Sequence, residues 1–265
     1  MTRTVSLLIA SVTLAFAACG NSDGGSGTGA GGTDAEETEL TVSAAASLTD
    51  AFTEIGDAFE ARHEGLTVTF NFGPSDGLAT QVVEGAPIDV FASASPTWMD
   101  AVQEDGPGLS GRADFARNRL AIILPAGNPA GVEDISDLTE DDLQLVIAAE
   151  GVPAGDYARE VFANAGISDG VLANVVSNAE DVRAVVTAIA SGEADAGVVY
   201  VTDVTADVAD RVALIEIPEE INVIATYPIA VVTGSQEADL AQGFVDFVLG
   251  DGQQILADFG FLPAS

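Results

Sequence analysis

Basic residues are scarce in this chain of 265 residues. It contains no lysine and only eight arginines, against 42 aspartate and glutamate residues, and its formal net charge at pH 7 is -34. Proteins that bind nucleic acid or an anionic membrane surface need clustered basic side chains to face the phosphate groups. The lysine of a phosphate-binding loop is missing as well. We therefore expect no nucleic-acid partner and no electrostatic attachment to lipid headgroups.

Cysteine and histidine are almost absent too. Cys19 and His63 are the single residues of their types, so an intrachain disulfide and a His/Cys zinc cluster are excluded. A serine hydrolase needs a base, and His63 lies in a polar Arg62-His63-Glu64 turn. Acidic runs such as 140–142 are typical of solvated faces. We expect no enzyme, no catalytic residue and no cofactor. An extracellular hydrolase is the alternative from another class, and an anchored sensor or adhesion module is a third.

The N-terminus resembles a secretory signal. Arg3 precedes an apolar stretch from Val5 to Ala18, shorter than the roughly 18 to 20 residues that a spanning helix needs. Residues 16–20, Phe-Ala-Ala-Cys-Gly, resemble a bacterial lipobox, in which the cysteine becomes the acylated first residue of the mature protein. We expect a signal peptide at 1–19, lipidation of Cys19 and anchoring outside the cytoplasm on the cell membrane. The alternative is an incidental cysteine in an ordinary signal peptide.

The composition changes twice along the chain. Residues 20–39 are rich in glycine, serine and acidic residues, which predicts a flexible, solvated tether. From residue 40 onward strand and helix patterns alternate, beginning with a β-branched strand at 40–43 and a helix in which Leu48, Phe52, Ile55 and Phe59 recur at helical spacing. Further strands are expected at 66–70, 88–92, 120–124, 145–148, 174–176, 196–200 and 227–232.

This alternation predicts an α/β fold with mixed, mostly parallel sheets flanked by helices. There are two successive sets of such units, so we expect two lobes. Lobe 1 comprises residues 40–117 and 227–265, because the last strand and helices are too few for a third domain. Lobe 2 comprises residues 118–226.

Ligands of open α/β sheets bind at the carboxyl ends of strands, where loops lead into helix N-termini. Ser47 and Ser75 each stand in such a loop beside small residues. Two further loops, at 151–157 and 178–183, begin helices, and Tyr200 ends a strand. Taken singly, the serines are better explained as ordinary helix caps.

Six strings of residues, in register from about residue 40 to 261, resemble the periplasmic molybdate-binding protein family. They are Ala-Ala-Ala-Ser-Leu-Thr at 44–49, Gly-Ala-Pro-Ile-Asp-Val-Phe-Ala-Ser-Ala at 85–94, Trp-Met-Asp at 98–100, Val-Pro-Ala-Gly-Asp-Tyr-Ala at 152–158, Glu-Asp-Val-Arg at 180–183 and Gly-Val-Val-Tyr at 197–200. The resemblance implies a two-lobed periplasmic-binding fold of type II with the ligand in the cleft between the lobes.

The resemblance also implies a set of ligand donors. In the family, two serines of one lobe, and two backbone amides and a tyrosine hydroxyl of the other, hold the tetrahedral oxyanion. These positions fall on Ser47, Ser75, Ala154, Val182 and Tyr200. The metal is expected only inside the oxyanion, not as a bare cation. The loop at 74–77 departs from the family's run of serines, and we expect Asp76 in it to point to solvent.

The residues and the resemblance agree on chemistry. A doubly charged oxyanion without a proton needs donors only, and neutral hydroxyls and amides supply them. We expect high-affinity binding of molybdate or tungstate by a monomer that delivers it to an ABC permease and its ATPase. Sulfate, another tetrahedral oxyanion, is the nearest alternative, because its exclusion depends on the size of the pocket.

Overall fold

Residues 38–265 are described by a computed structural model of the protein. The predicted signal peptide, Cys19 and nearly all of the predicted tether lie outside the described residues. No helix within residues 38–265 combines the length and the hydropathy needed to cross a membrane.

The first sheet is built around three parallel strands. β1 (Thr38–Ala45) lies between β2 (Leu66–Gly73) and β3 (Val90–Ala92) and is parallel to both. β9 (Ile224–Val232) pairs antiparallel with β3, and β4 (Leu109–Pro125) pairs antiparallel with β9. The short β10 (Leu262–Pro263) adds to β4.

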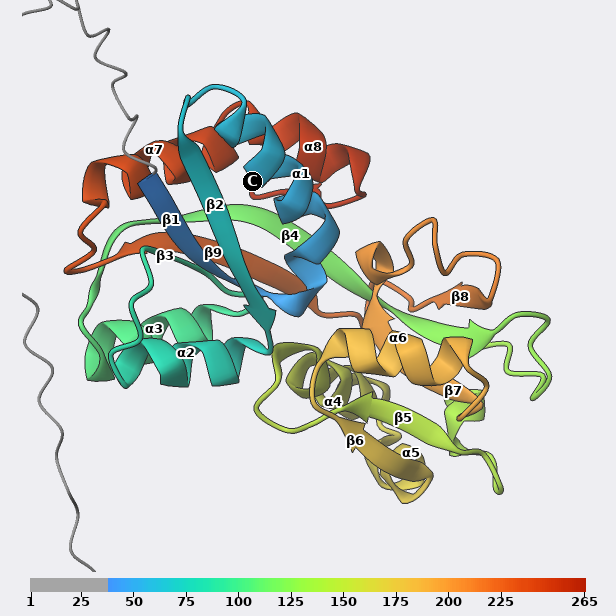
Figure 1. The fold of residues 1–265 in the computed structure, drawn as a ribbon. Coiled ribbons are helices and arrows are strands. Elements are labelled where there is room, and N and C mark those ends of the chain that lie inside the picture. Colours follow the sequence, from blue (N-terminus) through green and yellow to red (C-terminus); the bar gives the residue numbers. More distant parts are fainter. Residues whose placement is uncertain (1–37) are drawn as a thin grey trace, which may run out of the picture. The chain divides into compact units, whose positions relative to one another are not determined.

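Helices cover both faces of this first sheet, as Figure 1 shows. They are α1 (Thr49–Glu60), α2 (Ser75–Val83), α3 (Pro96–Asp105), α7 (Ala238–Leu249) and α8 (Gly252–Asp258). Side chains of β3 and β9 alternate between the two faces: Val90 joins the core under α1 and α7, whereas Phe91 joins the core under α2 and α3. Successive side chains of a strand point to opposite faces of the sheet, and here helices bury both faces. The strands are therefore apolar at nearly every position.

The second sheet repeats the parallel arrangement. β5 (Leu145–Ala148) lies between β6 (Val175–Ala179) and β7 (Ala196–Tyr200). The last residues of β4 pair antiparallel with β7 and with β8 (Val212–Glu216). The helices here are α4 (Pro153–Ala165), α5 (Ser168–Ala173) and α6 (Val182–Ala190). Three short 3-10 turns complete the fold: η1 (Ala46–Leu48), η2 (Ile135–Thr139) and η3 (Val201–Asp203).

One strand belongs to both sheets. Residues 109–119 of β4 pair with β9, and residues 120–125 pair with β7 and β8, so β4 runs from one sheet into the other (Figure 1). We call residues 38–119 and 224–265 the first half and residues 120–223 the second half. The expected lobe boundaries at 117/118 and 226/227 fall inside β4 and β9. The expected mixed sheets flanked by helices are confirmed. Antiparallel pairing is more frequent among the described strands than expected, because every described partner of β4 is antiparallel to it.

Candidate functional site

The two predicted serines leave neighbouring strands at the same edge of the first sheet. Ala45 of β1 is in register with Gly73 of β2, so the loops that follow both strands start side by side. Ser47 lies in η1 directly after β1, and Ser75 is the first residue of α2. Both side chains are buried. Parallel pairing therefore brings together two hydroxyls that are far apart in the sequence.

The predicted donors of the second half occupy the corresponding edge of the second sheet. Ala154 is in the first turn of α4, Val182 is the first residue of α6, and Tyr200 is the last residue of β7. Amides in the first turn of a helix have no acceptor within that helix and lie at its positive dipole end. Ala154 and Val182 thus present backbone N–H groups whatever their side chains are.

All five predicted residues line one small cavity. The remaining lining residues are Ala45, Ala46, Gly73, Pro74, Ala94, Val152, Pro153 and Asp181, so both halves contribute. The cavity volume is ≈ 20 Å³, which exceeds the roughly 10–15 Å³ that one water needs and is far below the roughly 300 Å³ of the smallest drug-sized sites. The space suits a compact ion rather than an organic metabolite.

The hydroxyl groups around the cavity have hydrogen-bond partners that leave their own protons free to donate, or have no partner among the described residues. Ser75 Oγ accepts a hydrogen bond of 3.1 Å from the Ala94 N–H, which directs the serine's own proton elsewhere. Ser47 Oγ lies 3.0 Å from the Tyr227 hydroxyl. The fully buried Tyr200 hydroxyl has no hydrogen-bond partner among residues 38–265. A buried hydroxyl without a partner costs free energy, so Tyr200 is a group that a ligand would satisfy.

The cavity wall carries no basic side chain. Its one acidic residue, Asp181, is engaged as the cap of α6, where its Oδ1 accepts from the Ala184 N–H at 2.8 Å. Burial, and then the neighbouring Tyr227 and Tyr157, raise the pKa of Tyr200 well above its usual value. Tyr200 therefore stays protonated and can donate throughout the accessible pH range. The wall thus offers neutral donors, and its carboxylate is engaged through Oδ1 at the start of α6.

Asp76 does not lie where the sequence suggested. Its Oδ1 is buried and has no hydrogen-bond partner in the described part of the chain. Its Oδ2 instead faces the turn at Gly151 in the second half. The expectation that Asp76 points to solvent is wrong, because the two halves meet over the start of α2. Asp76 is nevertheless absent from the cavity wall.

Polar contacts join the two halves on both sides of the cavity. Trp98 Nε1 of α3 donates to the Gly151 carbonyl at 2.9 Å. On the other side, Arg183 of α6 forms an ion pair with Asp50, and its Nε donates to the Ala46 carbonyl at 3.3 Å. Neither contact bears a predicted ligand donor. They hold the rim of the cavity closed.

A hydrolytic alternative finds no support at this site. Gly73-Pro74-Ser75-Asp76-Gly77 fits the Gly-x-Ser-x-Gly pattern of hydrolase nucleophiles and connects a strand to a helix. However, the described contacts of Ser75 Oγ include no histidine, and His63 Nδ1 pairs with the Phe59 carbonyl at 2.8 Å. Among residues 38–265, no imidazole is within hydrogen-bond distance of Ser75 Oγ.

Other hollows do not contain the predicted donors. A larger hollow of ≈ 670 Å³ is lined by Arg117 and Arg119 of β4, Glu216 of β8, Asn222 of the loop between β8 and β9, and residues around them. Its two arginines are engaged, Arg117 with the Pro263 carbonyl and Arg119 with Glu216. The small cavity between the halves is therefore the candidate site.

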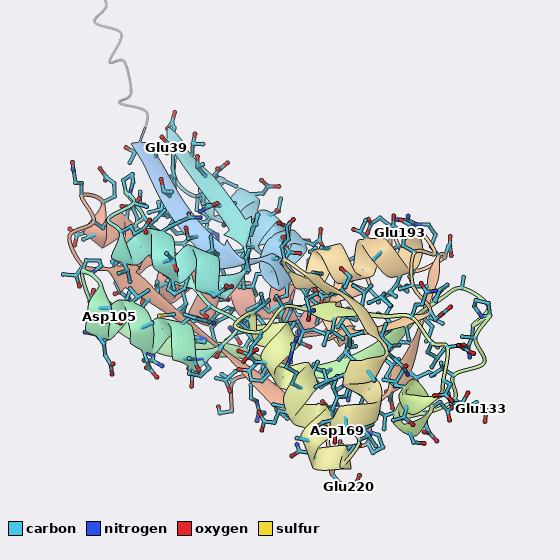
Figure 2. All side chains as sticks on the ribbon, turned by 90° about the horizontal axis from the view of Figure 1, so that it is seen from below. Glu39, Asp105, Glu133, Asp169, Glu193 and Glu220 are labelled. Carbon is cyan, nitrogen blue, oxygen red and sulfur yellow. The ribbon has the colours of Figure 1, made fainter. Side chains whose placement is uncertain are left out.

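The acidic side chains are spread over both halves rather than gathered at the cavity. Figure 2 labels six of them, Glu39, Asp105, Glu133, Asp169, Glu193 and Glu220, and all six are exposed. At high ionic strength the Debye length shrinks to about 3 Å near 1 M salt. Local donors then outweigh the repulsion that this surface exerts on an anion.

Sequence reasoning missed Tyr227, whose hydroxyl contacts Ser47 from behind the cavity wall. It was expected only as part of a strand. The chain has three tyrosines, and electrostatic coupling links Tyr157, Tyr200 and Tyr227. Because the chain has so few tyrosines, each of them could have been considered as a candidate for the site, Tyr227 included.

Comparisons with known proteins agree with this geometry. The profile of the bacterial extracellular solute-binding protein family matches residues 40–262. The molybdate-binding protein ModA of Mycobacterium tuberculosis is 39% identical over 223 residues, covering 84% of each chain. The putative ABC transporter substrate-binding lipoprotein YvgL of Bacillus subtilis is 30% identical over 265 residues, covering 98% of this chain and 99% of that one.

A solved structure shows the same architecture. The periplasmic molybdate-binding protein of Azotobacter vinelandii superposes with a TM-score of 0.75 at 22% identity, covering 84% of this chain and 98% of that chain. At this identity the likeness concerns the fold alone. It confirms the predicted α/β fold of a periplasmic-binding protein.

Proposed function

The chain belongs to the bacterial extracellular solute-binding protein family, and on this premise we propose that it binds molybdate in the cavity between its halves and delivers it to an ABC import permease. Its resemblance to molybdate-binding proteins extends over most of both sequences. Members of this family act outside the cytoplasm as binding components of transport systems, and we propose no reaction for this chain.

One observation carries the proposal: five buried residues that can supply neutral donors, from both halves, line one small cavity. Molybdate is a dianion without an acidic proton, so it can accept from every one of them. Each hydrogen bond to a charged group contributes about 1.5–3 kcal/mol. Several such bonds exceed the roughly 8 kcal/mol of a micromolar complex even after ordering costs.

The same set of hydrogen-bond donors supports selectivity for molybdate over hydrogen phosphate. The five proposed contacts supply donors only, so the proton of hydrogen phosphate would gain no hydrogen bond from them, and an unpaired buried donor is costly. Tungstate has the shape and charge of molybdate, so we propose that it binds as well. Sulfate also lacks a proton, and only its smaller size would discriminate against it. Sulfate is therefore the second candidate.

Calorimetric titration of the purified chain tests the proposal. Molybdate, tungstate, sulfate and hydrogen phosphate are titrated separately at low and high salt. We expect tight one-to-one binding of molybdate and tungstate only. Preference for sulfate would reassign the ligand, and no binding of any of the four would overturn the oxyanion reading. As a control, a Ser47→Ala plus Tyr200→Phe variant that is folded should lose binding.

We further propose that Cys19 carries a lipid anchor and that the protein acts as a monomer on its permease. The lipobox-like residues 16–20 support the anchor, as does the likeness to a relative named as a lipoprotein. Incorporation of labelled palmitate during expression tests it, with Cys19→Ala as the matched control. Equal labelling of both chains would contradict lipidation of Cys19.

A further inference from the structure

A buried tyrosine stands behind one of the donors of the cavity. Tyr227 lies on β9, is fully buried and does not line the cavity, yet its hydroxyl is 3.0 Å from Ser47 Oγ. We propose that Tyr227 is a positioning residue that fixes the Ser47 hydroxyl as a hydrogen-bond donor to the bound oxyanion. This inference rests on the proposed function and assigns a role to a residue outside the donor set.

The direction of the bond follows from the surroundings of Tyr227. The buried Asn118 amide faces the Tyr227 oxygen. Asn118 Oδ1 accepts from the Arg119 N–H at 2.9 Å and its Nδ2 donates to Thr202 at 2.8 Å, so the amide presents its nitrogen to this region. The Tyr227 oxygen thus faces a donor, and its own proton points to Ser47 Oγ.

Tyr227 also keeps that proton at all accessible pH values. Burial, and then the nearby Asp203 carboxylate, raise the pKa of Tyr227 far above its usual range, although hydrogen bonds with Ser47 and Asn118 lower it in part. The Tyr227 hydroxyl therefore keeps a proton that it can donate to a neighbouring acceptor. The Tyr200 hydroxyl lies near as well, and Tyr227 helps to raise its pKa, but by geometry the Tyr200 hydroxyl has no hydrogen-bond partner among the described residues. The contact of 3.0 Å with Ser47 Oγ is the one that the Tyr227 hydroxyl makes.

A serine hydroxyl has a single proton, so the bond it accepts decides where that proton goes. Ser47 accepts from Tyr227 on one side and can donate only into the cavity. Ser75 is arranged in the same way, with the Ala94 N–H in place of the phenol. The Tyr227–Ser47 bond and the proposed Ser47–oxyanion bond form a chain, and hydrogen bonds in a chain strengthen one another.

A double-mutant cycle with sodium molybdate tests the role of Tyr227. Tyr227→Phe keeps the ring, which packs edge-on against Phe115, Tyr200 and Phe261, so we expect the fold to survive, as thermal unfolding would show. We expect Tyr227→Phe to raise the Kd about fivefold to tenfold in the unmodified chain. In a Ser47→Ala background it should have no further effect, because the hydroxyl that it positions is gone.

Tyr200→Phe is the matched control, since it removes the phenol of a direct donor instead. It should raise the Kd by a similar factor with and without Ser47→Ala. Equal losses from Tyr227→Phe in both backgrounds would mean that the residue acts through packing, and this would overturn the inference alone. No molybdate binding by the unmodified chain would overturn both the inference and the proposed function.

Discussion

The two halves of the molecule supply the same kind of contact by different means. The first half offers side-chain hydroxyls, Ser47 and Ser75, at the ends of adjacent parallel strands. The second half offers the backbone amides of Ala154 and Val182 at helix N-termini, with Tyr200 as its one side-chain donor. A side-chain donor is lost by a single substitution, whereas a backbone donor depends on the path of the chain. The halves should therefore respond differently to mutation.

Removing one side-chain donor from each half should give the largest effect. The Ser47→Ala plus Tyr200→Phe variant loses two bonds to the anion, and we expect the Kd for molybdate to rise about 10²-fold or more, since each bond contributes about 1.5–3 kcal/mol. Calorimetry measures the Kd, and circular dichroism checks the fold. A folded variant that binds within tenfold of the unmodified chain would contradict the donor assignment.

A substitution that displaces the backbone of the second half should have the next largest effect. A Cβ at Gly155 would collide with the carbonyl oxygens of Ala148 and Ala149, so the first turn of α4 must shift. We expect Gly155→Ala to lower the free energy of unfolding by about 1–3 kcal/mol and to weaken molybdate binding. Denaturant unfolding and calorimetry measure the two effects.

Gly243→Ala provides the control for that variant. It lies within α7 of the first half, where a Cβ would meet only Phe59 Cζ at an ordinary 3.8 Å. Stability should be unchanged or slightly higher, since alanine favours helices. Similar losses from both glycine variants would mean that α4 has no special role.

A buried carboxylate in the second half should make stability depend on pH. Burial raises the pKa of Asp203 from 3.8 to about 7, opposed in part by Arg183 and by the Tyr200 N–H. Between about pH 4 and pH 7 the native state holds a proton that the unfolded state releases, so the free energy of unfolding falls with rising pH by up to about 1.4 kcal/mol per unit. Urea unfolding at several pH values should show a flatter dependence for Asp203→Asn; parallel curves would contradict the assignment.

Changing only the side chain of a residue whose backbone N–H is the donor should have the smallest effect. Val182→Ala keeps the N–H and its place at the start of α6, so we expect the Kd for molybdate to change by less than about threefold. Calorimetry beside Ser47→Ala gives the contrast directly. A loss as large as that of Ser47→Ala would show that the Val182 side chain, not its amide, matters.

The same contrast explains what could be predicted from the sequence. Ser47 and Tyr200 could be identified as candidates from their own chemistry at strand ends. Ala154 and Val182 could not be identified in this way, because every residue except proline has a backbone N–H and the residue type does not show which one donates. Only the family resemblance pointed to them. The structure brings all five to one cavity.

Long-range pairing accounts for what was missed. Residues 109–119 of β4 are largely polar and partly exposed, so only the apolar run at 120–124 predicted a strand. The antiparallel β4 consequently went unrecognised, and the sheets were expected to be mostly parallel. The contact of Tyr227 with Ser47 spans 180 residues, and the position of Asp76 beside Gly151 depends on the opposite half. No local pattern encodes such contacts.

The chain contains a single tryptophan, and that residue bridges the two halves. Trp98 donates to the Gly151 carbonyl across the rim of the cavity and is only partly buried. Any separation of the halves would hydrate the indole and shift its emission to longer wavelength. The fluorescence of Trp98 in the unlabelled protein would therefore report any separation of the two halves, including one that accompanies the binding or release of an anion.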